Sequence, residues 1–421
     1  MFDCNQIFLW YNSTVIKNMD TLIEIYQRLL REIVPSYRRK FYDDFRMDSR
    51  LLGIVGARGV GKTTFLINYL REQYAASAQT LYVSADNLYF VEHTLVEVVD
   101  QFVKEYDGQI ICIDEIHKYK NWDQELKNIY DSYPRLKVLF SGSSSVDIVK
   151  ARFDLSRRII LQTMYGFSFR EFLEIHEKQS YPVISFDDLT ANHNKYERDL
   201  MGVPKLLGYL KEYLKEGYYP TRFELRTYET FAQALSNIVD KTIYEDISSF
   251  YSLKTGNLDI LKKIIYYFAT TTPGSINTNN IATSLNKDHT TITDFIQMLR
   301  DTGLLRFLLI NKYGHALVRN AEKIYLDNTN LLYAINNGIG KEPFSGVLRE
   351  LFVISSLENA GHHVFYAKEG DFMCNNVTFE VGGKNKDTKQ IKTVDNSFLV
   401  KDDILIGGSK TIPLYLFGFL Y

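Results

Sequence analysis

Cysteine and long apolar runs are scarce in this chain of 421 residues. Its three cysteines, Cys4, Cys112 and Cys374, lie far apart and form neither a CxxC pair nor a Cys/His zinc spacing. This pattern predicts a reducing, cytoplasmic setting without a structural disulfide. No apolar run approaches the ~18 residues of a membrane span. Because the N-terminus carries Asp3 and lacks a basic start, we also expect no signal peptide.

An excess of one charge is also lacking. The 49 basic and 51 acidic side chains leave a net charge of −2, and 45% of the residues are apolar. A protein coated in basic surface for nucleic acid is therefore not expected, although a local patch is compatible with this total. The apolar content predicts packed cores, and the length allows about two to four domains.

What the chain does have is a glycine-rich loop between an apolar run and a helical pattern. Leu51–Val55 is apolar, Gly56–Lys62 forms the loop, and apolar residues recur at helical spacing from Thr63 onward. The loop fits the Walker A form G-x-x-x-x-G-K-[ST], in which backbone N–H groups and a helix N-terminus surround a phosphate. The predicted nucleotide-binding residues are Gly56, Ala57, Arg58, Gly59, Val60, Gly61, Lys62, Thr63 and Thr64.

Two side chains of this loop have predicted tasks. Lys62 would reach the β- and γ-phosphates as a point charge. The Thr63 hydroxyl would ligate Mg²⁺, which keeps several of its waters and needs few protein oxygens.

A second motif, QIICIDE at Gln109–Glu115, has the Walker B form of an apolar run that ends in two acids. Asp114 would hold Mg²⁺ directly or through water. Glu115 would polarise the attacking water as the general base. The alternative interpretation is an ordinary strand end with exposed acids.

A third apolar run, Leu136–Ser145, ends in hydroxyl residues. We expect Ser141 or Ser143 to lie between the two Walker motifs and to sense the γ-phosphate, and a serine-rich turn is the alternative. Before the first motif, Asp20–Ile33 has apolar residues at helical spacing and is followed by the basic residues 38–40. These basic side chains could touch adenine or phosphate, although a solvated face is the favoured interpretation.

Several of these stretches resemble a known family. DEIHKYKNWDQELKNIYD (Asp114–Asp131) with FSGSSS (Phe140–Ser145) is similar to the prokaryotic AAA-like proteins called archaeal-type ATPases. LSRRIILQTMYGFSFREFL (Leu155–Leu173) resembles the family segment in which an arginine precedes a strand and an SF-x-EF helix start. The resemblance spans nearly the whole chain and implies an ATPase that uses ATP rather than GTP.

The resemblance also implies a role for Arg157 and Arg158, which match the family's arginine position. Such a residue can act as a finger on the γ-phosphate of a neighbouring subunit, which would require a homo-oligomer. The alternative is an exposed basic pair before a strand.

The family joins a P-loop ATPase core to a winged helix and to an endonuclease-like domain of unknown function. We accordingly expect an N-terminal helical lead-in (1–50), the ATPase core (51–173), a helical lid or linker (174–250), a winged helix (251–320) and a C-terminal domain (321–421). The expected fold class is α/β: an AAA-like P-loop NTPase with a parallel sheet sandwiched by helices, a helical lid, a winged helix and a small α/β endonuclease-like domain.

The winged-helix pattern covers Leu258–Leu309. Its helices are expected at Leu258–Ala269, Ile276–Leu285 (capped by Asn277 or Thr278) and Thr290–Thr302, and its wing strand at Leu304–Ile310. The last helix would enter a DNA major groove with Lys287, His289, Thr290, Thr291 and Thr293. Because Asp288 and Asp294 would repel phosphate, a packing role is the alternative.

In the C-terminal domain the resemblance implies a nuclease-type site. Glu350, Asp371 and Glu380 match its three acids, but Gly382 stands where the lysine should be and Lys384 lies two residues further on. A shift of two residues moves a side chain by about 6–7 Å along a strand, so the domain could be inactive and serve in binding. The final Ile412–Tyr421 is expected to be a core strand or a partner-binding edge.

Taken together, the sequence predicts a Mg²⁺-dependent ATPase whose nucleotide state is coupled to C-terminal domains that bind duplex DNA or a protein partner. The alternatives are a binding adaptor with negligible turnover and an ATP-gated nuclease.

Overall fold

The computed structural model describes residues 18–143, 158–251, 253–274, 278–311, 322–387 and 389–421. The chain divides into two compact units, Met1–Met164 and Tyr165–Tyr421, and each unit is described by itself. In the described residues, no helix is both long and apolar enough to cross a membrane.

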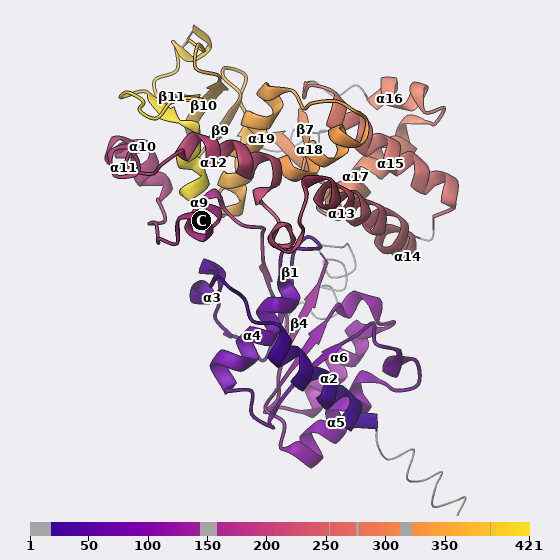
Figure 1. The fold of residues 1–421 in the computed structure, drawn as a ribbon. Helices are drawn as coiled ribbons and strands as arrows, with labels where there is room; N and C mark the ends of the chain where they lie inside the picture. Colours follow the sequence, from indigo (N-terminus) through magenta and orange to yellow (C-terminus); the bar gives the residue numbers. More distant parts are fainter. Residues whose placement is uncertain (1–17, 144–157, 252, 275–277, 312–321, 388) are drawn as a thin grey trace, which may run out of the picture. The chain divides into compact units, whose positions relative to one another are not determined.

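The described part of the first unit is a parallel sheet with helices against it (Figure 1, indigo to magenta). Its strands are β1 (Leu51–Val55), β2 (Thr80–Ser84), β3 (Ile110–Asp114), β4 (Lys137–Gly142) and β5 (Ile160–Thr163). Its helices are α2 (Asn18–Glu32), α3 (Lys40–Asp44), α4 (Lys62–Tyr74), α5 (Leu95–Tyr106) and α6 (Trp122–Ser132), with the short 3₁₀ helices η1 (Leu88–Val91) and η2 (Ile116–Lys118). This confirms the expected α/β class.

The strand order within this described sheet, β2-β3-β4-β1-β5, positions the site. All its pairings are parallel, so the carboxyl ends of the strands meet at one edge. β4 lies between β1 and β3, with Ile54 opposite Ser141 in the register. The Walker A loop after β1 and the acids at the end of β3 therefore face a common edge, with the hydroxyls of β4 between them.

Local sequence explains how the helices of this unit start and dock. α5 begins with a capping box, in which Thr94 accepts from the backbone N–H of Glu97 while the Glu97 carboxylate accepts from Thr94. α2 packs on β2 and α4, and the Tyr26 hydroxyl meets the Thr80 hydroxyl at 2.9 Å. The strands β1 and β3 are buried along their whole length, as expected for a parallel sheet covered on both faces.

The second unit combines helices with a mixed sheet (Figure 1, magenta to yellow). Its helices are α9 (Phe169–Glu177), α10 (Phe186–Ala191), α11 (His193–Leu200), α12 (Leu206–Glu212), α13 (Tyr228–Lys241), α14 (Ser248–Tyr251), α15 (Thr255–Thr270), α16 (Thr278–Ser284), α17 (His289–Asp301), α18 (Thr329–Gly338) and α19 (Ser345–Asn359). Its strands are β6 (Leu305–Ile310), β7 (Lys323–Leu326), β8 (Val364–Tyr366), β9 (Phe372–Cys374), β10 (Val377–Gly382), β11 (Ser397–Lys401) and β12 (Thr411–Pro413). Short π-helical turns, η3 (Tyr213–Gly217) and η5 (Thr242–Ile247), extend α12 and α13, and the 3₁₀ helices are η4 (Pro220–Glu224), η7 (Lys389–Ile391) and η8 (Leu414–Phe419).

The helices α15, α16 and α17 lie at the three stretches expected to be helical, and α17 packs against both α15 and α16. A winged-helix domain stays a prediction. The strand expected as its wing, β6, belongs to a larger sheet, whose described strands run in the order β12-β11-β10-β9-β8-β6-β7. β6 pairs antiparallel with β7 and parallel with β8. The five-part domain division stays a prediction, but its boundary between residues 320 and 321 falls inside this sheet.

The C-terminal end differs from the expected strand. Only Thr411–Pro413 pairs with β11, and the chain then turns into the buried 3₁₀ helix η8. A proline at a short edge strand removes a ladder donor, and the following apolar residues are buried in the 3₁₀ helix, which lies against α19 and α9. The interpretation of Ile412–Tyr421 as one core strand was therefore wrong, although its residues are core residues.

Candidate nucleotide-binding site

The glycine-rich loop has the backbone that a phosphate cradle requires. Gly59 and Gly61 have positive φ angles of 82° and 98°, which side chains disfavour. At Gly56 a Cβ atom would lie 2.2 Å from the carbonyl oxygen of Met164, so only glycine fits there. Gly61 is the N-cap of α4 and has no side chain to cap it, which leaves the first N–H groups of this helix available to an anion.

The other loop residues surround this cradle. Val60 is fully buried, Ala57 and Arg58 are half-buried, and Gly59 is exposed. Lys62 is buried, and its Nζ donates to the carbonyl oxygens of Gly56 at 2.9 Å and Ala57 at 3.0 Å. The ammonium group therefore lies over its own loop, where a bound phosphate would meet it. Thr63 and Thr64 follow in the first turn of α4, both half-buried.

Asp114 is the centre of the site and joins its two motifs. Thr63 Oγ1 donates to Asp114 Oδ2 at 2.5 Å, and the Tyr82 hydroxyl donates to the same oxygen at 2.8 Å. Ser141 Oγ donates to Asp114 Oδ1, which also accepts from the backbone N–H of Glu115 at 3.1 Å. Burial, and then the charge of Asp114, raise the pKa of Tyr82 well above its ordinary value, which keeps this hydroxyl protonated.

The oxygen atoms at Asp114 and its hydroxyl neighbours are of the kind that Mg²⁺ prefers as ligands. A threonine hydroxyl and a carboxylate lie side by side, and Mg²⁺ bound with a nucleotide takes few protein ligands beside phosphate and water. The described residues contain no cluster of three or more His, Cys, Asp or Glu side chains that could hold a metal ion. Thr63 and Asp114 therefore fit a Mg²⁺ that arrives with the nucleotide, rather than a metal held by protein ligands alone.

Glu115 follows in a left-handed conformation, with φ 52° and ψ 39°, which is uncommon for a residue with a side chain. Its Oε2 lies 3.4 Å from Nε2 of His117, whose side chain is only 3% exposed. The same Nε2 lies 3.3 Å from Ser143 Oγ. The structure thus brings Glu115, Ser141 and Ser143 together, and it adds His117 and Tyr82, which sequence reasoning did not single out.

Arg158 lies elsewhere in the first unit. It precedes β5, which runs parallel to β1, so it lies at the opposite edge of the sheet from the glycine-rich loop. Its Nε and Nη2 each meet an Asp131 carboxylate oxygen at 3.2 Å, and its guanidinium lies over the Tyr130 ring. A finger role for Arg158 therefore stays a prediction that only a neighbouring subunit could satisfy. Arg157 lies outside the described residues.

The basic stretch before β1 is only partly solvated. Arg38 and Lys40 form exposed ion pairs with acidic neighbours, as expected. Arg39 instead is buried, and its Nη1 donates to the carbonyl oxygen of Val60 at 3.0 Å. The Tyr42 hydroxyl likewise donates to Thr64 O at 3.3 Å. The solvated interpretation was therefore wrong for Arg39, and no sequence pattern signals this contact, which links positions 21 residues apart.

A second carboxylate cluster lies in the second unit. Lys323 Nζ meets Glu350 Oε2 at 2.9 Å and Asp371 Oδ1 at 3.4 Å, and the Tyr325 hydroxyl donates to Glu350. Glu380, on β10, is fully buried and pairs with Lys386. The lysine that reaches Glu380 is therefore Lys386, which folds back from the following loop, and not Lys384, which is exposed.

The winged-helix candidates are engaged within the protein. His289 Nε2 lies 2.5 Å from Thr278 Oγ1, and Lys287 Nζ donates to Asn257 at 3.4 Å. Asp288 caps α17 by accepting from the N–H and hydroxyl of Thr291, which lowers the pKa of Asp288 and keeps it charged. Thr293 donates to the His289 carbonyl. DNA contact through this face stays a prediction, and Asn277 lies outside the described residues.

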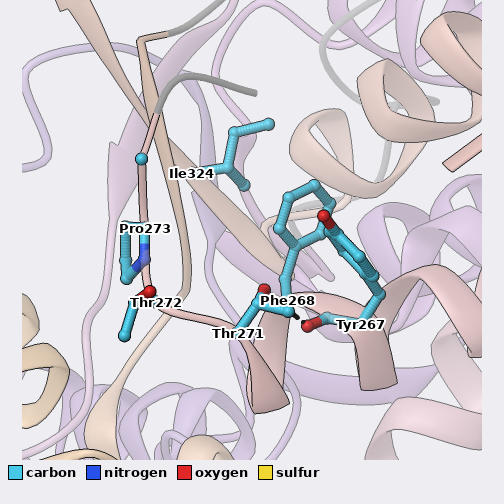
Figure 2. Close-up of a pocket in the computed structure, with 7 residues that line it drawn as sticks. Tyr267, Phe268, Thr271, Thr272, Pro273 and Ile324 are labelled. Atoms are coloured by element: carbon cyan, nitrogen blue, oxygen red, sulfur yellow. Dashed lines mark hydrogen bonds between the residues drawn. The ribbon is translucent and has the colours of Figure 1, made fainter. Parts of the chain in front are cut away.

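A pocket in the second unit lies between the end of α15 and β7 (Figure 2). Its lining residues are Tyr267, Phe268, Thr271, Thr272, Pro273, Gly274 and Ile324. The Thr271 hydroxyl is turned back to the Tyr267 carbonyl, 2.8 Å away. None of these lining residues is charged, and we assign no ligand to the pocket.

Comparison with protein families agrees with this geometry. Residues 48–173 match the model of an AAA domain, and residues 207–342 match a domain of unknown function, DUF8612. The first match includes the glycine-rich loop, Asp114 and Glu115 at the end of β3, and the hydroxyl residues at the end of β4. Residues 48–173 thus form an AAA-type P-loop ATPase domain, a domain type that binds ATP.

Two uncharacterized proteins of Methanocaldococcus jannaschii are similar to this chain. MJ1637 is 26% identical over 289 residues, which cover 65% of this chain and 60% of MJ1637. MJ1544 is 24% identical over 354 residues, 80% of this chain and 73% of MJ1544. The chain thus spans less than two thirds of the first of these relatives.

Solved structures with some likeness include a RuvB variant of Thermotoga maritima and DnaA of Aquifex aeolicus bound to AMPPCP. The RuvB match has 17% identity, covers 68% of this chain and 89% of that chain, and has a TM-score of 0.29. The DnaA match has 16% identity, covers 66% and 86%, and has a TM-score of 0.25. We infer nothing from scores this low.

Proposed function

We propose that this protein hydrolyses ATP with Mg²⁺ at the site around Asp114. The observation that carries the proposal is the contact between Thr63 and Asp114, 2.5 Å apart, which joins a phosphate-binding loop to a buried carboxylate. The donors to Asp114 among the described residues are hydroxyls and one backbone N–H, which bring no positive charge, so the site suits a cation beside the carboxylate. A phosphate cradle next to a cation site is the arrangement that phosphoryl transfer requires.

In this proposal each residue of the site has a separate role. The backbone N–H groups of the loop and the first turn of α4 bind the phosphates, and Lys62 exchanges its two carbonyl partners for phosphate oxygens. Thr63 and Asp114 hold Mg²⁺, which neutralises the charge that develops on the transferred phosphoryl group. Glu115 orients the attacking water and accepts its proton. Ser141 and Ser143 contact the γ-phosphate.

The test is steady-state phosphate release from Mg·ATP by the wild type, Lys62→Ala and Glu115→Gln, with binding of a fluorescent ATP analogue measured in parallel. Lys62→Ala is expected to weaken binding and turnover together. Glu115→Gln should retain binding and lose about 10²–10⁴-fold in turnover, because only the general base is removed. Lys62→Ala with the turnover of the wild type would contradict the proposal.

A second candidate is a nucleotide-controlled adaptor with negligible turnover. The observation that favours it is the two-point contact of Arg158 with Asp131, since a finger held in its own subunit does not reach a neighbour's phosphate. This candidate predicts a single burst of phosphate with tight retention of nucleotide. Continuous turnover by a purified monomer would exclude it.

For the partner of the second unit, we favour a docked protein over duplex DNA. His289, Thr291 and Thr293 are already hydrogen-bonded within the segment of α16 and α17, and Asp288 adds negative charge at the start of α17. DNA binding through phosphates would make log K fall by about 0.9 per contact with log salt. A steep salt dependence of duplex binding, and a rise in phosphate release on adding duplex, would favour DNA instead.

The nuclease alternative stays a prediction. Lys386 pairs with Glu380, and Lys323 pairs with Glu350 and Asp371. Mg²⁺-dependent cleavage of nucleic acid that is lost in Glu380→Ala would support it.

A further inference from the structure

His117 lies between the general base and one of the γ-phosphate residues of the proposed ATPase site. Its Nε2 is 3.4 Å from Glu115 Oε2 and 3.3 Å from Ser143 Oγ. The Glu115 oxygen is buried and has no hydrogen-bond partner among the described residues. A buried carboxylate oxygen without a donor is costly, and the histidine nitrogen is the group beside it.

The chemistry of the two neighbours determines which ring nitrogen carries a proton. An ionised carboxylate only accepts hydrogen bonds, so Nε2 must bear the hydrogen if it is to stabilise Glu115 Oε2. Ser143 Oγ can accept from the same N–H and still donate its own hydrogen elsewhere. In that tautomer one N–H would face both the Glu115 carboxylate and the Ser143 hydroxyl.

The backbone gives a reason for this arrangement. Glu115 has φ 52°, a conformation that costs free energy for a non-glycine residue, and it begins the 3₁₀ turn that contains His117. Strained residues of this kind persist where the surrounding structure fixes them, often at functional sites. The distance of 3.4 Å is longer than an ordinary hydrogen bond, as is common for catalytic contacts before the substrate binds.

We propose that His117 is a positioning residue: it fixes Oε2 of Glu115, so that Oε1 is presented to the attacking water, and it links Glu115 to Ser143. This inference rests on the proposed ATPase function. A γ-phosphate that engages the Ser143 hydroxyl would shift the shared N–H contact and thereby the carboxylate. His117 thus makes the position of the base depend on whether the γ-phosphate is present.

The experiment compares His117→Leu, which has a similar size but no donor, with His117→Gln, whose amide can still donate to Glu115. We expect His117→Leu to lower kcat by about 10- to 100-fold, because a misplaced base loses much of its effect. The Kd for a fluorescent ATP analogue should remain within about 2-fold, since the loop that binds phosphate is untouched. His117→Gln should recover most of kcat.

Lys120→Ala, an exposed residue of the same segment, is the matched control and should retain the kcat of the wild type. If His117→Leu does not fold, Ser143→Ala removes the other partner of Nε2 and should lower kcat with little change in Kd. The inference is overturned if His117→Leu turns over like the wild type, faster than the wild type, or no worse than His117→Gln.

The double variant separates this inference from the function on which it rests. If His117 acts through Glu115, adding His117→Leu to Glu115→Gln should cause no further loss. Independent, multiplying losses would overturn the positioning role. Loss of turnover in Glu115→Gln, together with wild-type turnover in His117→Leu, would remove this inference and leave the ATPase intact. Wild-type turnover in Glu115→Gln would instead remove Glu115 as the base.

Discussion

The two units each bury carboxylates, and they stabilise them in opposite ways. In the first unit the described donors to Asp114 are the hydroxyls of Thr63, Tyr82 and Ser141 and one backbone N–H. In the second unit, Lys323 and Lys386 supply positive charge to Glu350, Asp371 and Glu380. Hydroxyl partners leave the negative charge in place for an incoming cation, whereas lysine partners supply that cation from the protein.

This difference explains why similar residue types lead to different expectations. Both clusters contain the acids of a metal-dependent phosphate chemistry, and only the first adjoins an anion-binding loop. Burial alone would lower the pKa of Lys323, but Glu350 and then Asp371 raise it above its ordinary value, so the lysine is charged at neutral pH. The second cluster is thus a set of ion pairs whose carboxylates have lysine partners within the protein.

The largest effect is expected at the centre of the second cluster. Lys323→Met would leave Glu350 and Asp371 without their shared cation inside the protein. Breaking a buried pair by removing one partner costs about 3–5 kcal/mol. Urea denaturation followed by circular dichroism measures the loss, and a stability equal to that of the wild type would show that these carboxylates do not need Lys323.

The contrasting change in the first unit is Asp114→Asn, which removes the charge. The Asn oxygen would still accept from Ser141 and the Glu115 N–H, and the hydroxyls of Thr63 and Tyr82 would turn to accept from the Asn NH₂ group. We expect turnover of Mg·ATP to fall by about 10²–10³-fold, as for the loss of one electrostatic contact to the transition state. The melting temperature should not fall, because no ion pair is broken. Phosphate release over a range of Mg²⁺ concentrations tests the first statement, and calorimetry tests the second. Destabilisation as large as that of Lys323→Met would contradict the proposed difference between the two clusters.

A smaller effect separates the two lysines that follow β10. Lys386→Met should destabilise the protein by about 1–3 kcal/mol, because it leaves a buried carboxylate unpaired, with the lower end favoured since Lys386 is 34% exposed. Lys384→Met is the matched control and should change little, since Lys384 is exposed. Equal losses in the two variants, measured by urea denaturation, would contradict the assignment of Lys386 to Glu380.

The smallest effect is a pH dependence at Glu380. Burial raises the pKa of Glu380 above 4.5, although Lys386 opposes the shift. For a raised pKa, the stability contributed by the group is fully present below its unfolded pKa and is lost as pH rises through the folded pKa. Glu380→Gln should therefore gain stability relative to the wild type as the pH rises above 4.5. If the difference in the free energy of unfolding between the two proteins stays constant or falls as the pH rises, burial does not destabilise the charged form of Glu380.

Much of the first unit could be predicted because its signals are local. The loop Gly56–Thr63 follows β1, and Asp114 and Glu115 lie at the end of β3. A parallel sheet brings the carboxyl ends of its strands to one edge. The pairing of Thr63 with Asp114 follows from this topology. The residues that sequence reasoning missed, Tyr82, His117 and Arg39, depend on contacts that no fixed spacing encodes.

The second unit shows the limit more clearly. The sequence placed the helices α15 and α17 to within a few residues, because their apolar periodicity is local. It did not show that β6 and β7 pair across an expected domain boundary, or that the chain after Pro413 forms a 3₁₀ helix. Strand partners far apart in the sequence are chosen by packing, which a local pattern does not contain.

The nucleotide-binding motifs could be predicted from the residue order, because Walker motifs need particular residues at particular spacings around a phosphate. The partners of each buried carboxylate became visible only in the folded chain. Lys386 reaches Glu380 from six positions further along the chain, and Lys323 reaches Glu350 and Asp371 from 27 and 48 positions away. Because charge pairing depends on distance through space, only the folded chain shows which buried acids have a lysine partner.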